Sequence, residues 1–511
     1  MHLDEFLYNL QFDTEKVRPP DWDVDWEDAP LPYKLYRDLP VFPLSIEVPL
    51  TLEVEPPLSQ PDIRSFGHFL WYVFGLSQIS QFEQEKDIVQ SLRRFAPSGG
   101  ALYPNELYVY LKLENVPEGI YHYDAAHHRL ILLREGNFDS YIAEALGNRC
   151  EMNDCFGTVF VSTMFWKNFY KYNNFSYRLQ GLDAGVLMGQ LLETAKRFGF
   201  AAGVYFQFLD KAINHLLGLW ELEESTYAVI PLSTSPIANS DSADKVSANE
   251  LYRELPGIHA RHYMRSKRVK PYPLLNKLNA ASMMETTKRF RPITMTDWKH
   301  DKGKSVKLPP VKPLLYDLAT ASRKRLSPEM DFIFGKVSQG QLASLLQEAI
   351  TSFAYQNDLD EPGIKCEPRV SIFGCLHNIE GIQDGAYSYD GVSHELRRIN
   401  TGDYRNKLQY GMTMDNVNLQ LIPLCLHVTG ERDHYKAQLG YRGYRIQQME
   451  AGMLVQRLLL LSSALGMGGH PLLGFDVNTC DEIYRMDDLT SLIQIPIGHY
   501  QNRAWLKGSL Y

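Results

Sequence analysis

The chain has 511 residues, 44% of them apolar and 22% charged, with a formal net charge of −9. This length exceeds what one hydrophobic core supports, so two or more domains are expected, and the composition is that of a globular rather than a disordered protein. The acidic charge argues against broad electrostatic binding to nucleic acid, which needs a basic surface.

Neither the cysteines nor the apolar stretches indicate a metal site, a disulfide framework or a membrane span. The most apolar helical stretch, residues 453–467, carries Gln456 and Arg457 and is shorter than the roughly 18 residues that a span needs. The first residues lack the basic and apolar regions of a secretory signal. The six cysteines form no CxxC pair, so we expect reduced thiols, no bound metal and a cytoplasmic protein without a membrane partner.

In the first half of the chain, the expected elements follow an irregular lead-in. Residues 1–56 are rich in Pro, Trp and Asp and show little periodicity. A helix is expected next, with Ser59 as the residue that caps its first N–H groups and apolar residues at helical spacing behind it. Runs of β-branched and aromatic residues predict strands at 107–113 and 158–163, and a long helix is expected over 182–197.

The second half shows the same kinds of pattern after a basic linker. Residues 236–313 are polar, and their basic segment 261–270 predicts a solvent-exposed face. Beyond the linker, a helix is expected from about residue 337, strands at 370–376 and 419–429, and a long helix at 449–465.

Several strings of the first half return in the second half at a nearly constant offset. Gly-Ile-Tyr-His-Tyr-Asp at 119–124 returns as Gly-Ala-Tyr-Ser-Tyr-Asp at 385–390, and Tyr177-Arg178 returns as Tyr444-Arg445. One long self-similar unit indicates an internal duplication. The expected domains are therefore the lead-in 1–56, a first copy at 57–235, the linker 236–313 and a second copy at 314–511.

Both long helices carry an Ala-Gly pair, at 184–185 and at 451–452. Small residues let two helices approach closely. Two interpretations stay open: the helices of the two copies contact each other at these positions, or each helix packs on the strands of its own copy.

The loop that follows Arg93-Arg94 reads Phe-Ala-Pro-Ser-Gly-Gly-Ala-Leu-Tyr-Pro over residues 95–104. Gly99 and Gly100 have no side chain, so the backbone can lie against a flat ligand, and Ser98 offers a hydroxyl group. On its own, a Gly-Gly turn before a strand is more often a structural loop than a binding site.

The whole string closely resembles the Pro-Ser-Gly-Gly-Ala-Leu loop of the SagB/ThcOx-type dehydrogenases, within the FMN-dependent nitroreductase superfamily. The resemblance extends to Pro-Tyr-Lys-Leu-Tyr at 32–36, to 119–124 and to the stretch 171–185. It implies an α+β nitroreductase-like fold with a largely antiparallel sheet, and dimers that hold FMN in the seam between two subunits. The two fused copies are then expected to form an intramolecular pseudo-dimer.

The resemblance also implies which residues hold FMN, and the two copies differ there. The loop Ser98–Gly100 occurs in the first copy only, whereas the paired glycines Gly468 and Gly469, at the place where the superfamily has a loop along the flavin edge, occur in the second. We therefore expect one composite FMN site built from both copies, and a mirror-image site without FMN.

The phosphate end of the expected site comes from the second copy. Members of the superfamily begin with a short basic cluster that binds the FMN phosphate, and the second copy has Arg323 and Arg325 there, whereas the first copy has acidic residues. Arg503, after the last expected strand, is a further candidate for binding the cofactor.

Lys171 and Tyr172 are the expected catalytic residues. They match a Lys-Tyr pair that the resemblance implies in proton removal beside the flavin, whereas the second copy has Gln438-Leu439 at the same offset. A desolvated lysine can have a pKa low enough to act as a base near neutral pH. A Lys-Tyr pair is also a common surface dipeptide, so this role depends on the resemblance.

The resemblance implies an FMN-dependent oxidoreductase that oxidises azoline-type rings in a modified peptide, or a related small molecule, beside a cyclodehydratase partner. A second interpretation is a general reductase of nitro or quinone compounds that uses NAD(P)H. A third interpretation, from another class, is a catalytically degenerate module that binds a flavin or a peptide.

Overall fold

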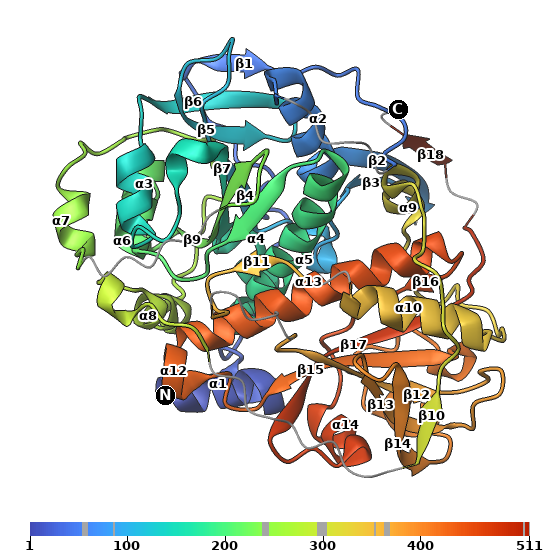
Figure 1. Cartoon of the computed structure of the whole chain (residues 1–511). Coiled ribbons are helices and arrows are strands. Elements are labelled where there is room, and N and C mark those ends of the chain that lie inside the picture. Colours follow the sequence, from blue (N-terminus) through green and yellow to red (C-terminus); the bar gives the residue numbers. More distant parts are fainter. Residues whose placement is uncertain are drawn as a thin grey trace.

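Two layered α/β halves lie on either side of a long helix, α13 (Arg442–Ala464). In this computed structural model the described residues are 1–53, 60–84, 87–237, 245–293, 304–351, 354–361, 368–503 and 506–509. Figure 1 shows most of the blue and green part of the chain above α13 and most of the orange and red part below it; the blue helix α1 (Leu3–Phe12) lies below α13 and the dark-red strand β18 (Leu506–Ser509) above it. The α+β class expected from the sequence is confirmed.

The first half is built on an eight-stranded sheet. Neighbouring strands are antiparallel except for the last pair, which is parallel. The central strands are buried along their whole length because helices cover both faces. In spatial order the strands are β1 (Val41–Pro43), β6 (Arg129–Glu135), β5 (Gly119–Asp124), β4 (Asn105–Leu111), β7 (Cys155–Met164), β9 (Glu224–Ser233), β8 (Ala201–Val204) and β11 (Gln356–Asn357).

The second half is built on a seven-stranded antiparallel sheet. Its strand order repeats the order of the first seven strands of the other sheet, with β12 in the place of β4 and β17 in the place of β9. In spatial order the strands are β10 (Ser305–Lys307), β14 (Glu395–Thr401), β13 (Gly385–Asp390), β12 (Ser371–Leu376), β15 (Leu424–Glu431), β17 (Leu489–Gly498) and β16 (Gly468–Gly469).

Helices surround both sheets. The helix expected behind Ser59 begins at Ile63, and Asp62 caps it in a reciprocal pair of hydrogen bonds with Ser65; Ser59 lies outside the described residues. Besides α13, the α-helices are α1 (Leu3–Phe12), α2 (Ile63–Phe74), α3 (Asp139–Ala145), α4 (Trp166–Tyr172), α5 (Ser176–Arg197), α6 (Asp210–Leu217), α7 (Ala248–Tyr252), α8 (Pro273–Ser282), α9 (Leu318–Lys324), α10 (Gln339–Thr351), α11 (Arg405–Tyr410), α12 (Lys436–Leu439) and α14 (Val477–Tyr484).

The long helices α5 and α13 cross in backbone contact at the two expected glycines. A Cβ atom at Gly185 would overlap the carbonyl of Met449, and one at Gly452 would overlap the carbonyl of Leu182. The first of the two interpretations of the small residues, contact between the two long helices, is therefore confirmed. Glycine is required here because any side chain would push the helices apart.

Further pairs along the same crossing join residues that are 266 or 267 positions apart. The rings of Tyr177 and Tyr444 stack with centroids 6.1 Å apart, and Gln456 Nε2 donates to Gln190 Oε1 at 2.7 Å. One hydrophobic core contains residues from both halves. The two halves are thus joined by core packing rather than by a polar surface contact.

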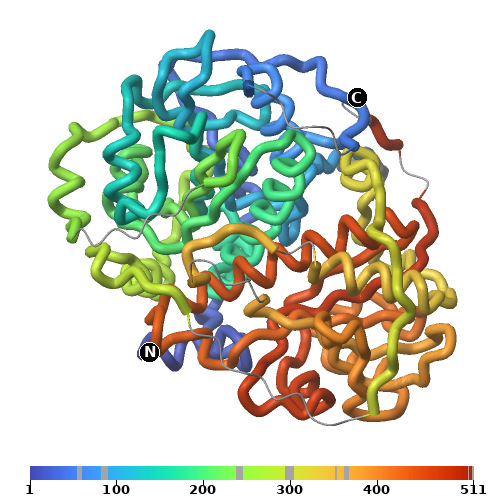
Figure 2. Tube along the Cα trace, in the orientation of Figure 1, coloured from blue at the N-terminus to red at the C-terminus, as the bar shows by residue number. Residues whose placement is uncertain are grey.

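Each end of the chain packs against the opposite half (Figure 2). The N-terminal helix α1 lies beside the second half, where Gln11 Nε2 donates to the Ser491 carbonyl at 2.7 Å. The C-terminal strand β18 (Leu506–Ser509) pairs with β2 (Leu76–Gln84), which pairs with β3 (Asp87–Arg94) in a third, three-stranded sheet. Because β3 ends directly before the loop that contains Ser98, the C-terminal strand belongs to the same small sheet as the start of that loop.

The lead-in and the linker contribute strands to the sheets. β1, in the lead-in, pairs with β6, and β10, in the linker, pairs with β14. The basic segment 261–270 is not only a solvated face, because the backbone N–H groups of Lys267 and Arg268 both donate to the Asp28 carboxylate at 2.8 Å. Lead-in and linker therefore pack together over the first half.

Candidate functional site

The loop before β4 is tied to the long helix α5 through Asp183. Ser98 Oγ donates to one Asp183 carboxylate oxygen at 2.5 Å, and the Gly99 N–H donates to the other at 3.1 Å. The Tyr103 N–H in turn donates to Ser98 Oγ at 2.9 Å. Gly100 has a φ of 64°, in the left-handed region that favours glycine. The loop is thus held by side chains, and its exposed Gly100 turns outward.

The Asp183 carboxyl group is buried, with 7% of the residue exposed. Burial raises its pKa to about 6, although the hydrogen bonds from Ser98 and Gly99 act in the opposite direction. A carboxyl group that titrates this close to neutral pH lies directly beneath the predicted flavin loop.

Lys171 and Tyr172, at the end of α4, lie against the same loop. A Cβ atom at Gly100 would be 2.5 Å from Tyr172 Oη and 3.1 Å from Lys171 Nζ. The structure therefore brings the predicted loop and the predicted catalytic pair together. Gly100 is needed for this approach as well as for its own backbone conformation.

Lys171 forms no ion pair with any carboxylate of the described residues. Burial lowers the pKa of the Lys171 ammonium group, which lies 5.0 Å from the Tyr172 ring centroid and 5.5 Å from that of Trp26. Burial and the Asp183 charge raise the pKa of Tyr172 to about 12. Of the two groups, Lys171 is therefore the one whose pKa is shifted toward the neutral range, whereas the pKa of Tyr172 is shifted away from it.

A second lysine on α4 supports the loop from below. Lys167, one helical turn before Lys171, forms a buried ion pair with Glu106 of β4. Its Nζ also donates to the Tyr103 carbonyl at 3.3 Å. The loop is thus fixed at both its helix side and its sheet side, as a preorganised binding loop requires.

Two guanidinium groups lie side by side at the edge of the loop. Arg325 is 4% exposed, its Nε finds no hydrogen-bond partner, and its backbone carbonyl accepts a hydrogen bond from Arg93. Burial and the neighbouring Arg93 charge lower the pKa of Arg325 to about 9. Among the described residues no carboxylate pairs with either group, although Arg93 also donates to Gln78 Oε1 at 3.2 Å. Two adjacent cations without a carboxylate favour the binding of an anion, and Arg325 is the less satisfied of the two.

The other two predicted arginines already have partners. Arg323 donates to the Leu50 carbonyl at 2.5 Å. Arg503 forms ion pairs with Asp331 and with Glu329, the latter at 3.0 Å. An anion would have to compete with these acceptors, so the structure favours Arg325 over Arg323 and Arg503.

Gly468 and Gly469 form the edge strand β16, next to the basic pair. Side chains at Gly468 are excluded, because a Cβ atom would overlap Pro328 and lie 2.9 Å from the Tyr500 ring. Tyr500 is near enough to Arg93 for each to shift the pKa of the other. The parts predicted from the two halves of the chain therefore converge on one region.

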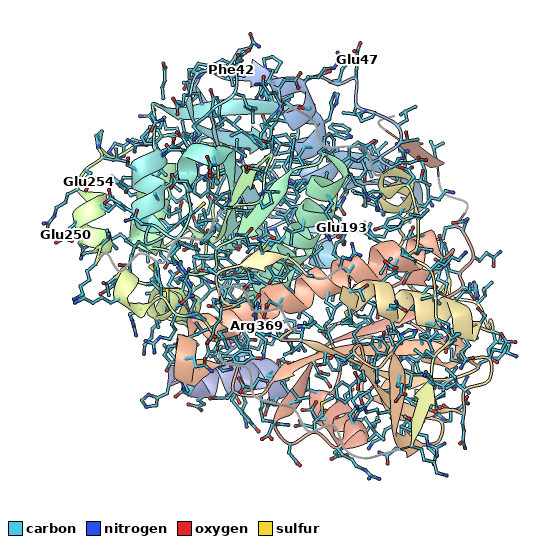
Figure 3. All side chains as sticks on the ribbon, viewed as in Figure 1. Phe42, Glu47, Glu193, Glu250, Glu254 and Arg369 are labelled. Carbon is cyan, nitrogen blue, oxygen red and sulfur yellow. The ribbon has the colours of Figure 1, made fainter. Side chains whose placement is uncertain are left out.

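In the other half, the acidic residue at the position of Asp183 is held in an ion pair. Glu450 of α13, 267 residues after Asp183, pairs with the buried Arg369 at 2.6 Å, and Arg369 also pairs with Asp360; Figure 3 shows Arg369 beside α13. There β11 pairs with β8, and Asp358 accepts hydrogen bonds from the N–H groups of Phe206 and Gln207 at 2.8 and 2.9 Å. The preceding loop, residues 362–367, lies outside the described residues.

Sequence reasoning missed three residues of this region, namely Arg93, Asp183 and Tyr500. Arg93 was visible as half of a basic pair directly before the loop, and Asp183 as part of a repeated string. Nothing in the sequence pointed to Tyr500, whose proximity to Arg93 arises from the exchange of chain ends.

The five cysteines of the described residues are buried and have free thiols, and Cys366 lies outside those residues. Within this part of the chain no cluster of potential metal ligands is present, and none of its helices has the length and hydropathy needed to cross a membrane.

Comparison with known proteins finds similarity to nitroreductases over part of the chain. Residues 76–231 match the model of the Nitroreductase family. A candidate nitroreductase of Methanocaldococcus jannaschii is 24% identical over 152 residues, 29% of this chain and 76% of that protein. The trifolitoxin-processing protein TfxB of Rhizobium leguminosarum bv. trifolii is 27% identical over 142 residues, 27% of this chain and only 38% of that protein.

One solved structure is similar over nearly the whole chain. The crystal structure of a candidate nitroreductase from Anabaena variabilis matches with a TM-score of 0.74 at 22% identity, covering 98% of this chain and 99% of that one. The fold is therefore a nitroreductase-like α+β fold.

Proposed function

We propose that this chain is an FMN-dependent oxidoreductase in which two fused nitroreductase-like copies form an intramolecular pseudo-dimer with one flavin site between them. The observation that carries the proposal is the convergence of Gly100, Lys171 and Tyr172 near two guanidinium groups without a carboxylate partner, Arg93 and Arg325. Such a set combines a cradle for a flat ring, a proton-transfer group and an anion site.

The pseudo-dimer is supported by the repeated strand order and by the self-complementary helix crossing. Gly185 meets the helix of Gly452 and Gly452 meets the helix of Gly185, which is the pattern of a contact across a twofold axis. Tyr177 and Tyr444 stack in the same way. Two fused copies with the domain limits 57–235 and 314–511 account for these contacts.

The residues present fit FMN at one of the two related positions. The buried Nε of Arg325, which has no partner among the described residues, and the adjacent Arg93 suit the phosphate dianion. Gly99 and Gly100 leave backbone accessible to the rings, whereas Gly468 and Gly469 are buried against Pro328, Tyr500 and Leu459 and can only lie behind the site. At the other position, Glu450 is already paired with Arg369, and the backbone N–H of Phe206 already donates to Asp358. One FMN per chain is the expected content.

Bound FMN supplies hydride acceptance and the return of two electrons to O₂. For an azoline ring, oxidation to the azole removes one hydride and one proton. Lys171 Nζ is the group positioned to take the proton, since its pKa is lowered by burial and it lies beside the loop. Tyr172 remains a hydrogen-bond donor because its pKa is raised to about 12.

A peptide substrate is supported by the similarity to TfxB, a protein named for processing trifolitoxin. We infer a SagB/ThcOx-like role in which a cyclodehydratase partner forms the azoline and this chain oxidises it, in the cytoplasm. Trp26, which is 60% exposed beside Lys171, provides an aromatic surface at the entrance for such a ring.

A second candidate function is the reduction of nitro or quinone compounds with NAD(P)H. The match to the Nitroreductase family model over 76–231 favours it. The first candidate enzyme oxidises its substrate, whereas the second reduces its substrate with electrons from NAD(P)H. A requirement for NAD(P)H therefore distinguishes the two activities.

The test begins with the full chain purified with FMN. Flavin absorbance should correspond to one FMN per chain, and Gly100→Ala should reduce it, whereas Gly340→Ala, at a position where the nearest atom is 3.9 Å away, should not. An azoline-containing peptide under O₂ should lose two hydrogens by mass spectrometry. Turnover of nitro compounds with NADPH but not of the peptide would establish the second candidate, and failure to take up FMN would indicate a binding module instead.

A further inference from the structure

The lead-in segment 22–28, here called the strap, packs against α4 beside the candidate flavin site. Near the start of the strap, Trp22 meets Phe169 edge-on, with ring centroids 5.3 Å apart. Further along, the ring centroid of Trp26 lies 5.5 Å from Lys171 Nζ. Residues 22–28 form no helix or strand, so the position of the strap depends on these contacts and on the segment that holds it from outside.

The linker holds the strap through Asp28. The backbone N–H groups of Lys267 and Arg268 donate to the Asp28 carboxylate and hold the pKa of that carboxyl group below its usual range. The Asp28 carbonyl accepts a hydrogen bond from Ser266 Oγ at 2.6 Å, and Ser266 Oγ accepts one from Trp166 Nε1 at 2.9 Å. Because Trp166 is the first residue of α4, the strap, the linker and this helix form one connected unit.

Lys171 lies beside two aromatic rings of this unit. Its Nζ is 5.0 Å from the Tyr172 centroid and 5.5 Å from the Trp26 centroid, both within the roughly 6 Å over which a ring face attracts a cation. No carboxylate of the described residues pairs with the ammonium group. The rings therefore favour the charged form of Lys171, whereas burial favours its neutral form.

An aromatic partner suits a lysine that changes its charge during a reaction. A lysine that accepts a proton must be neutral before the step and must hold the proton after it. A carboxylate partner would favour the charged form strongly before the step. A ring face attracts the ammonium group more weakly, above all where the ring is exposed, as Trp26 is at 60%.

We propose that Trp26 is a positioning residue for Lys171: the strap, fixed by the linker, holds the indole ring where its face stabilises the ammonium form of the lysine. The consequence for catalysis rests on the proposed function, in which Lys171 takes the proton from the substrate. The lead-in and the linker then share one role at the site.

The test is acetylation of the full chain, purified with FMN, by a trace of acetic anhydride at a series of pH values. The rate at Lys171 is read by peptide mass spectrometry. Only the neutral amine reacts, so the midpoint of the rate–pH curve reports the protonation of Lys171, and the plateau at high pH reports its access to the reagent.

Two variants of Trp26 form a matched pair. Trp26→Phe keeps a ring face, whereas Trp26→Leu keeps apolar bulk without one. Below the midpoint, Lys171 in Trp26→Leu should react roughly two- to fivefold faster than in Trp26→Phe, with the same plateau, because the ammonium form has lost its partner. Lys211, which lies 4.8 Å from the Tyr252 centroid, is the internal reference, and its curve should be the same in both variants.

The outcome that overturns the proposal is an identical Lys171 curve in the two Trp26 variants, or a difference in the plateau alone, since a plateau reports access only. Asp28→Ala leaves Trp26 in the chain but releases the strap from the linker. It should move the midpoint in the same direction as Trp26→Leu, and an unmoved midpoint would refute the role of the linker.

Azoline oxidation separates this proposal from the proposed function. If Lys171 takes the proton, the pH–rate profile of the oxidation should move in Trp26→Leu together with the acetylation midpoint. A midpoint that moves while the oxidation profile stays the same would support the contact between Trp26 and Lys171 and refute the proton-transfer role of the lysine.

Discussion

Replacement of Arg325 by methionine is expected to weaken FMN binding while leaving the FMN-free protein at least as stable as before. These two effects have opposite signs because the Arg325 guanidinium is buried beside Arg93 without a carboxylate. A merely structural arginine would change both properties in the same direction.

The size of each effect follows from the surroundings of Arg325. Its pKa falls from the ordinary arginine value to about 9 in the fold, a shift that corresponds to about 5 kcal/mol against the charged form. Because 9 is above neutral pH, the charge is retained at pH 7, and its cost is present throughout the range below pH 9. Replacing a buried charge by an apolar side chain of similar length is then expected to stabilise the FMN-free protein by roughly 1–4 kcal/mol.

The loss of FMN affinity is set by the hydrogen bonds to the phosphate. Each charge-assisted bond contributes about 1.5–3 kcal/mol, so Arg325→Met should raise the Kd of FMN roughly 10- to 150-fold. The assays are fluorescence titration of FMN into the FMN-free protein and urea unfolding of the same preparation. Arg323→Met is the matched control, since Arg323 donates to the Leu50 carbonyl, and it should change the Kd less. A variant that unfolds at lower urea but retains the wild-type Kd would refute the anion site.

Three further changes test the rest of the site and the helix crossing. Lys171→Ala should leave FMN bound but slow the oxidation by roughly 10²–10⁴-fold, the usual contribution of a general base, and unchanged turnover would remove Lys171 from the mechanism. Asp183→Asn should remove a pH dependence: because the pKa of Asp183 is raised from 3.8 to about 6, its contribution to stability is present below pH 3.8 and lost as the pH rises through 6. Between pH 4 and pH 7 the free energy of unfolding of the wild type, measured in urea, should therefore fall by about 3 kcal/mol relative to that of Asp183→Asn. A constant difference between the two proteins would mean that Asp183 does not titrate there. Gly452→Ala should destabilise the protein by about 1–3 kcal/mol or more through its overlap with the Leu182 carbonyl, whereas Gly340→Ala should have no such cost.

Patterns within a short window of sequence predicted the core elements well. The apolar run at 107–113 corresponds to β4 (Asn105–Leu111) and the run at 370–376 to β12 (Ser371–Leu376), because a buried strand is determined by its own side chains. The strand expected at 419–429 begins only at Leu424, since Asn418 caps a short turn over Leu419–Leu421. Three-residue edge strands such as β1 and β10 have no periodicity that could reveal them.

The part of the candidate site that lies on one loop could be predicted from the sequence. The charge pairing between residues far apart in the sequence could not. The loop at Ser98–Gly100 and the pair Lys171-Tyr172 follow from the resemblance, and the structure brings them together. The ion pairs of Arg503 join residues more than 170 positions apart, so its charge compensation could not be anticipated. The same holds for Arg93, whose neighbour Arg325 comes from the other half of the chain.

The difference between the two related regions can be traced to one acidic position on each crossing helix. Asp183 is short and accepts hydrogen bonds from a hydroxyl group and a backbone N–H, which fixes a glycine loop without covering it. Glu450 pairs instead with Arg369, which also engages Asp360. Removing one partner of such a buried pair costs about 3–5 kcal/mol, so these ion pairs contribute to the stability of the second half. The proposal of a single flavin site agrees with this difference, because a second site would require new partners for Glu450 and Asp360.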